Sequence, residues 1–132
     1  MVKKIILLCT LISSTLFATE VNWAKNYQTA LNDAKNSKKL VLMVVDRRGC
    51  PYCELLKEDV IESASVTEYI NKNFIPLLVT QNDGTYPEDK FIVHGTPTTY
   101  FITAKGEIHM SPIIGYVKKD KYLRYLGMGL TQ

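Results

Sequence analysis

The sequence predicts an α/β fold in which helices flank a central mixed β-sheet. Residues 40–45 (LVLMVV) form a short apolar run rich in β-branched residues, which is typical of a strand buried on both faces. Helical patterns, with apolar residues every three or four positions, lie on both sides of this run. Two further apolar runs, at 98–103 and 107–114, enclose a Lys-Gly turn and predict an antiparallel hairpin.

The first half of the chain is expected to contain a helix, the buried strand and a second helix. The apolar face of the first helix, predicted over about 21–35, consists of Trp23, Tyr27, Ala30, Leu31 and Ala34. Pro51 suits the first turn of the second helix, where its missing N–H is no loss. Its apolar side consists of Cys53, Leu56 and Val60.

The second half is expected to add a helix, a strand, the hairpin and a last helix. The helix is predicted around Val66, Tyr69 and Ile70, and the strand over 74–79 (FIPLLV). Pro76 has no N–H to donate to a neighbouring strand, so this strand is expected at or next to the sheet edge. A polar loop at 80–87 and a helical turn at 88–93 lead to the hairpin. The last helix is predicted over about 117–126, with Val117, Leu123 and Leu126 toward the sheet.

The first 18 residues, MVKKIILLCTLISSTLFA, have the parts of a secretory signal peptide: two lysines, a short apolar stretch and a small final residue. The apolar stretch is shorter than the roughly 20 residues that a membrane span takes. We therefore predict a signal peptide at 1–18 and one exported domain at 19–132. An uncleaved anchor is the alternative.

Charge and size narrow the possible partners. The chain of 132 residues carries 16 basic and 13 acidic residues, a net charge of +3. Loss of Lys3 and Lys4 with the signal peptide lowers this charge to +1, which gives no electrostatic basis for binding nucleic acid or an anionic membrane. The mature chain is long enough for one hydrophobic core. We expect a monomer.

The predicted chemistry centres on two cysteines three positions apart, Cys50 and Cys53. The third cysteine, Cys9, lies in the predicted signal peptide and leaves with it. In an oxidising compartment the remaining two can pair with each other, and no larger disulfide framework is possible. The pair follows a buried strand and opens a helix, whose first N–H groups favour a thiolate. Cys50 is therefore the expected nucleophile.

Cys53 is the expected resolving residue. It lies one helical turn further, on nearly the same face, so it can attack a mixed disulfide formed on Cys50. A purely structural bridge is the alternative, although a bridge closing so short a loop stabilises a fold little. A zinc site would need two more ligands, and His94 and His109 lack the spacing, so no metal is expected.

Two segments of the sequence resemble the thioredoxin-like superfamily: VVDRRGCPYCELLK at 44–57 and HGTPTTYFITAKGEI at 94–108. The resemblance covers nearly all of the mature chain. It implies that Pro97 is in the cis form beside the cysteines, that the backbone of Thr96 pairs with an extended substrate segment, and that Pro97 keeps metal ions away. The predicted catalytic residues are Cys50 and Cys53, and the predicted substrate-binding residues are Pro51, Tyr52, Thr96 and Pro97.

The chain departs from the thioredoxins proper at several positions. Those proteins carry Trp-Cys-Gly-Pro-Cys and a buried Asp six residues before the first cysteine, where this chain has Val44. Asp46 and Glu54 are the nearest carboxylates, but neither is assigned a catalytic role. With its export signal, the chain most resembles small periplasmic thioredoxin-like proteins of bacteria.

The resulting hypothesis is a periplasmic oxidoreductase that exchanges disulfides with exported proteins. The reductase direction is favoured because there is no room for the extra domains of dedicated oxidases and isomerases. A membrane thiol-electron transporter is then implied as a partner, and no cofactor beyond the disulfide is expected. The alternatives are a disulfide oxidase, which Arg47 and Arg48 would favour, and a peptide-docking module with a structural bridge. Ile92 and Tyr100 are expected mostly in the core, and Tyr52 on the surface.

Overall fold

The computed structural model describes residues 19–132, and the predicted signal peptide lies outside this part. In chain order, the elements are α1 (Tyr27–Ser37), β1 (Leu40–Asp46), α2 (Pro51–Leu55), the π-helical continuation η1 (Leu56–Ile61), α3 (Ala64–Asn73), β2 (Phe74–Thr80), β3 (Thr98–Ile102), β4 (Ile108–Ile114) and α4 (Lys119–Thr131). Within the described residues, no helix is both long enough and apolar enough to span a bilayer.

The four strands form one mixed sheet in the order β2-β1-β3-β4. β1 pairs in parallel with β2 and antiparallel with β3, and β3 pairs antiparallel with β4. The predicted mixed sheet and hairpin are therefore confirmed. β2 lies at the sheet edge, as Pro76 predicted, because a proline cannot complete a ladder with neighbours on both sides.

The outer side of β2 is covered by the segment that precedes α1. The N–H of Ala24 donates to the carbonyl of Pro76 at 2.8 Å. The side-chain amide of Asn71, on α3, holds the same segment by donating to the Glu20 carbonyl at 2.7 Å and accepting from the Asn22 N–H at 2.9 Å. The first described residues are thus tied to the sheet edge.

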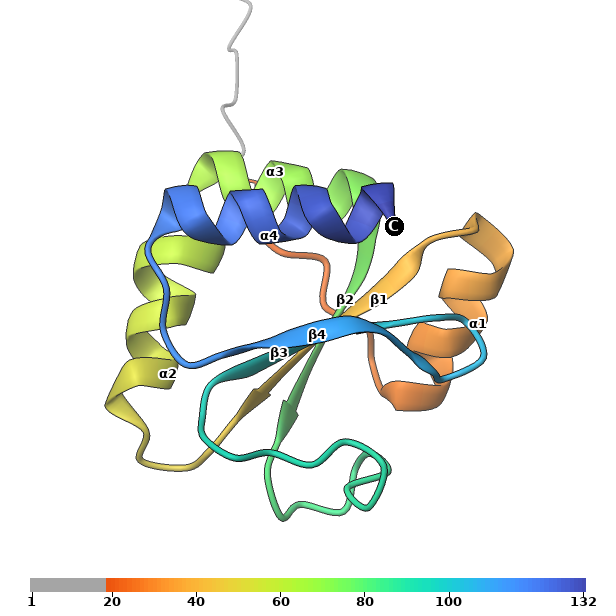
Figure 1. The fold of residues 1–132 in the computed structure, drawn as a ribbon, viewed down its shortest axis with the longest axis horizontal. Coiled ribbons are helices and arrows are strands. Elements are labelled where there is room, and N and C mark those ends of the chain that lie inside the picture. Colours follow the sequence, from red (N-terminus) through yellow and green to blue (C-terminus); the bar gives the residue numbers. More distant parts are fainter. Residues whose placement is uncertain (1–18) are drawn as a thin grey trace, which may run out of the picture.

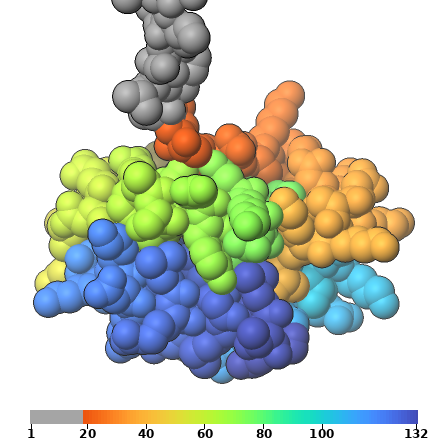
Figure 2. Space-filling model, turned by 90° about the horizontal axis from the view of Figure 1, so that it is seen from above, coloured from red at the N-terminus to blue at the C-terminus, as the bar shows by residue number. Residues whose placement is uncertain are grey.

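Helices cover both faces of the sheet (Figure 1). Because successive side chains of a strand point to opposite faces, Leu42 and Val44 of β1 pack with η1, α3 and α4, whereas Val41, Met43 and Val45 pack with α1. Figure 2 shows α3 and α4 side by side on one surface of the molecule. Asp46, two residues after Val44, therefore points toward the side of α2 and η1.

The ends of two helices differ from the prediction. α1 begins at Tyr27 because Asn26 is an N-cap in extended conformation, whose side chain accepts from the Thr29 N–H at 2.8 Å. Trp23 lies before the helix and packs against the core on the α3 and α4 side. α4 runs on to Thr131 and buries Tyr122, Leu126 and Gly129.

Ile92 corrects another expectation, because its side chain is 54% exposed and does not belong to the core. It lies in the irregular segment between β2 and β3, where hydrogen-bonded turns form at Thr80–Asp83 and after Pro87, but the helical turn predicted over 88–93 does not form a helix. Tyr100 is buried, as expected, and its hydroxyl donates to the Ile92 carbonyl. The Ile92 backbone is therefore fixed while its side chain faces outward.

Candidate active site

The cysteine pair lies where β1 passes into α2. Gly49 allows this sharp change of direction because its φ of +68° is in the left-handed region that favours glycine. Cys50 is the N-cap of α2, and its carbonyl accepts from the Glu54 N–H at 3.3 Å. The strand anchors the pair from one side and the helix from the other, as the sequence predicted.

Cys50 and Cys53 form a disulfide with a Cα–Cα distance of 5.3 Å. The N–H of Cys53 donates to the Cys50 sulfur at 3.2 Å, so a backbone donor is aimed at the atom that would carry the thiolate charge. Cys50 is 4% exposed and Cys53 is 1% exposed. Between them, Pro51 and Tyr52 are on the surface, and Tyr52 is 64% exposed.

The Thr96-Pro97 bond is cis and lies beside Cys50. The Cys50 sulfur is 3.4 Å from the Thr96 hydroxyl oxygen and 3.7 Å from the Thr96 carbonyl oxygen, across 46 positions of sequence. Because a disulfide sulfur carries no hydrogen, the hydroxyl is the donor. Figure 1 shows the β1–α2 connection and the chain entering β3 at the same end of the sheet. The structure thus brings the predicted residues together.

Arg47 and Arg48 adjoin each other in sequence but have different partners. The Nε–H of Arg47 donates to the Thr96 hydroxyl oxygen at 3.4 Å. Arg48 pairs with Asp83 at 3.0 Å, and its side chain is 85% exposed. The two arginines look alike in the sequence, and only the folded structure gives them different partners. Arg47 alone is connected to the cysteine pair through a hydrogen-bonded side chain.

A largely buried ion pair lies beyond Cys53 on the same helical segment. Lys57, one turn after Cys53, places its ammonium 3.5 Å from the Asp46 carboxylate and 2.9 Å from that of Glu54. The Thr80 hydroxyl also donates to Asp46, at 2.7 Å. Asp46 and Glu54 were recognisable from the sequence as the nearest carboxylates, but Lys57 and Thr80 were not predicted to join them. The one available signal was the distance of four residues between Cys53 and Lys57, which places them on nearly one helical face.

The charges around Lys57 favour its protonated form. Burial alone lowers the pKa of Lys57, but its hydrogen bond to Glu54 and the negative charges of Asp46 and Glu54 outweigh this effect. Its pKa therefore lies above the ordinary value of 10.5. The ammonium thus stays charged at neutral pH and holds Asp46 in place.

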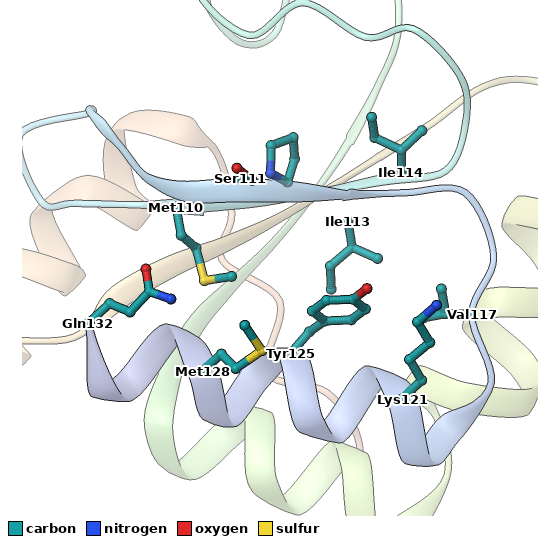
Figure 3. A pocket seen from close by; sticks show the side chains of 10 residues that line it. Met110, Ser111, Ile113, Ile114, Val117, Lys121, Tyr125, Met128 and Gln132 are labelled. Carbon is teal, nitrogen blue, oxygen red and sulfur yellow. The ribbon is translucent and has the colours of Figure 1, made fainter.

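The cysteine pair is almost completely buried and does not line the hollow that the structure forms between β4 and α4. This hollow has a volume of about 560 Å³, and Met110, Tyr125 and Met128 point toward one another there (Figure 3). None of the predicted site residues lines it. In the part of the chain that the structure describes, no group of three or more His, Cys, Asp or Glu side chains could hold a metal ion.

A cysteine pair at the start of a helix, beside a cis Thr-Pro bond at one end of a mixed sheet, places the protein in the class of thioredoxin-fold domains with a paired-cysteine motif. The comparison with protein families is more specific. A family model described as a thioredoxin-like domain matches residues 27–129. The chain belongs to this thioredoxin-like family. Comparison with curated protein sequences gives no match.

Solved structures agree with this fold. The oxidoreductase DsbH superposes with a TM-score of 0.73 at 16% identity, over 86% of this chain and 87% of DsbH. A proposed disulphide isomerase from Bacteroides thetaiotaomicron gives 0.72 at 24% identity, over 86% and 96% of the two chains. A thioredoxin from Thermus thermophilus gives 0.70 at 22% identity, over 82% and 85%. At these identities the similarity concerns the fold.

Proposed function

We propose that this protein exchanges thiols and disulfides with exported proteins through Cys50 and Cys53, chiefly as a reductase. The observation that carries this proposal is the asymmetry of the pair. The Cys50 sulfur lies beside the Thr96 hydroxyl and carbonyl, along which an extended segment could lie, whereas Cys53 has no such contact among the described residues and is 1% exposed against 4% for Cys50. One sulfur is therefore placed to meet a partner, and the other to react only with the first.

The proposed reaction has two displacement steps. The Cys50 thiolate attacks one sulfur of a substrate disulfide, the substrate S–S bond breaks, and the first substrate thiolate leaves. Cys53 then gives up its proton and attacks Cys50, which breaks the mixed disulfide and releases the second substrate thiolate. The two substrate thiolates take up two protons from the solvent, which balance the proton lost by Cys53 and the one lost earlier by Cys50. The substrate gains two electrons and two protons, and the protein is left with the Cys50–Cys53 disulfide.

Repeated turnover needs a dithiol donor that reduces this disulfide again. We place the protein in the periplasm, after removal of residues 1–18, and propose a membrane thiol-electron transporter as the donor. Proteins named as oxidoreductase, thioredoxin and disulphide isomerase among the structural neighbours support an exchange reaction of this class. We propose no cofactor beyond the disulfide and no metal. Pro51, Tyr52, Thr96 and Pro97 are the proposed substrate contacts.

The test is reduction of insulin by the mature protein with dithiothreitol as donor. Cys50→Ser is expected to lose all activity above background, because the attacking sulfur is gone. Cys53→Ser is expected to stop after the first step and to accumulate mixed disulfides through Cys50. Normal rates in both variants would contradict the exchange function. Unchanged binding of partners by Cys53→Ser, without mixed disulfides, would favour a docking module with a structural bridge.

The direction of exchange is tested separately by equilibrating the pair with a glutathione buffer. A reduction potential near about −270 mV, where thioredoxin lies, is expected for a reductase. A value near about −120 mV, where a strong periplasmic oxidant lies, would assign the opposite direction.

A further inference from the structure

We propose that Arg47 is a positioning residue that directs the Thr96 hydroxyl hydrogen to the Cys50 sulfur and so stabilises the Cys50 thiolate. The proposal rests on the exchange function above, and it assigns to Arg47 an effect on the equilibrium between the dithiol and disulfide forms of Cys50 and Cys53. It is carried by two consecutive contacts, from Arg47 Nε to the Thr96 hydroxyl oxygen at 3.4 Å and from that oxygen to the Cys50 sulfur at 3.4 Å.

The chemistry of the three groups fixes the direction of these contacts. A guanidinium only donates hydrogen bonds, so the Thr96 oxygen must accept from Arg47. A hydroxyl has one hydrogen to donate, and with a lone pair engaged by Arg47 that hydrogen is left for the sulfur. A donor whose oxygen itself accepts from a cation is also polarised, which strengthens its own hydrogen bond. The result is an oriented donor aimed at Cys50.

The orientation matters because Thr96 offers the sulfur two opposite interactions. Its carbonyl oxygen, 3.7 Å away, can accept a hydrogen from a protonated thiol but repels a thiolate. Its hydroxyl, 3.4 Å away, can donate to a thiolate. Arg47 favours the second interaction. The Cys53 N–H, 3.2 Å from the same sulfur, adds a second donor to the charged form.

A more stable thiolate makes the reduced protein more stable, and so makes the disulfide a stronger oxidant. Arg47 is exposed, which limits the effect of its charge. One hydrogen bond of ordinary strength corresponds to a shift of about threefold to tenfold in the exchange equilibrium. For a two-electron couple, that range is about 15 to 30 mV.

Arg48 provides a matched control within the same loop. Arg47→Met and Arg48→Met each remove one positive charge, but only the first removes a contact with Thr96, since Arg48 is bound to Asp83. Each variant is equilibrated with glutathione, and its thiolate is titrated by ultraviolet absorbance. Arg47→Met is expected to shift the equilibrium toward the disulfide by about threefold to tenfold and the thiolate titration to higher pH. Arg48→Met is expected to change the equilibrium by less than about twofold.

A double-mutant cycle tests whether Arg47 acts through the hydroxyl. In a Thr96→Val background, which lacks the hydroxyl, Arg47→Met is expected to have almost no effect. In a Thr96→Ser background, which keeps it, the effect is expected to persist, and this second variant also guards against a folding defect in the first. Arg47→Lys, which keeps the charge but not the guanidinium, is expected to be intermediate.

Two results would overturn the proposal: equal shifts for Arg47→Met and Arg48→Met, or an Arg47→Met shift that survives in Thr96→Val. Either would mean that Arg47 acts only as a nearby charge. If the wild-type pair itself fails to equilibrate with glutathione, the exchange function fails, which is a distinct outcome from the loss of the Arg47 effect alone.

Discussion

The two cysteines share one disulfide, but their surroundings differ in kind. The Cys50 sulfur contacts the Thr96 hydroxyl, behind which stands an exposed arginine. Beyond Cys53, the helix leads to Lys57 and its largely buried pair with Asp46. The environment of Cys50 consists of neutral and charged hydrogen-bond donors near solvent. The environment beyond Cys53 is an ion pair that joins η1 to β1. We therefore expect substitutions on the Cys50 side to change reactivity, and those on the Cys53 side to change stability.

Breaking the Asp46 contacts is expected to have the largest effect on stability. Asp46→Asn removes the more buried of the two carboxylate partners of Lys57 and weakens the bond from Thr80, so we expect a loss of about 2 kcal/mol in the free energy of unfolding. Asp83→Asn is the matched control, because it breaks an exposed pair and should cost less than about 0.5 kcal/mol. Urea denaturation measures both. Equal losses of unfolding free energy in Asp46→Asn and Asp83→Asn would show that the contacts of Asp46 contribute no more than an exposed ion pair.

The Lys57 pair also predicts where pH should and should not matter. Because the folded protein holds the pKa of Lys57 above 10.5, its value in the unfolded chain, the stability that it contributes is complete below pH 10.5. This contribution is lost only as the pH rises through the higher folded value. Lys57→Met should therefore lower the urea midpoint by the same amount at pH 7 and pH 9. A difference that shrinks between these two pH values would contradict the assignment.

Near Thr96, a neutral hydrogen bond between buried side chains joins β3 to α4, and its loss is expected to lower the free energy of unfolding less than Asp46→Asn does. Thr99 lies two residues after Pro97, and its hydroxyl is 3.0 Å from that of the fully buried Tyr122. Tyr122→Phe leaves Thr99 without this partner, so we expect a loss of about 1 kcal/mol at pH 7. Thr99→Val, which removes the same bond from the other side, is the control for the bond itself.

The stabilities of Tyr122→Phe and Thr99→Val are expected to differ at alkaline pH. Burial raises the pKa of Tyr122 well above its ordinary value of 10, although the hydrogen bond with Thr99 acts the other way. Above pH 10 the unfolded chain loses this proton while the folded protein keeps it, so stability falls as the pH rises. Tyr122→Phe should abolish this part of the fall, whereas Thr99→Val should retain it. Parallel pH profiles for the two variants would contradict this origin.

The smallest effect on stability is expected at Tyr52, an exposed residue between the two cysteines. Its side chain is 64% exposed, so Tyr52→Ala should change the free energy of unfolding by less than about 0.5 kcal/mol. If Tyr52 contacts substrate as proposed, the variant should raise KM for a protein substrate while leaving the glutathione equilibrium unchanged. An unchanged KM would remove Tyr52 from the proposed contact surface.

The sequence predicted those parts of the fold that depend on local patterns. The apolar run of β1, the proline at N1 of α2 and the edge position of β2 each follow from the chemistry of a few adjacent residues. The position of Thr96 beside Cys50 came from the resemblance to a family. No local pattern relates residues that lie 46 positions apart.

The remaining features depend on tertiary contacts. Trp23 repeats the helical spacing of α1 but packs on the opposite face of the sheet, so its periodicity was misleading. α4 extends beyond the prediction because Gly129 permits a close approach: a Cβ there would lie 2.7 Å from the Phe101 ring. The partners of Arg47 and Arg48 depend on loops that meet only in the folded chain.

The covered edge of β2 affects the tendency of this protein to self-associate. An open edge strand offers unpaired N–H and C=O groups on which another molecule can add a strand and begin an aggregate. In this protein the Ala24 N–H donates to the Pro76 carbonyl, and the Asn71 side chain forms hydrogen bonds with the backbone just before Ala24. The proposed cleavage after residue 18 keeps the whole segment that covers β2, whose first hydrogen-bonded residue is Glu20. A mature N-terminus trimmed past Ala24 would therefore expose a surface for self-association, even though the redox pair would be untouched.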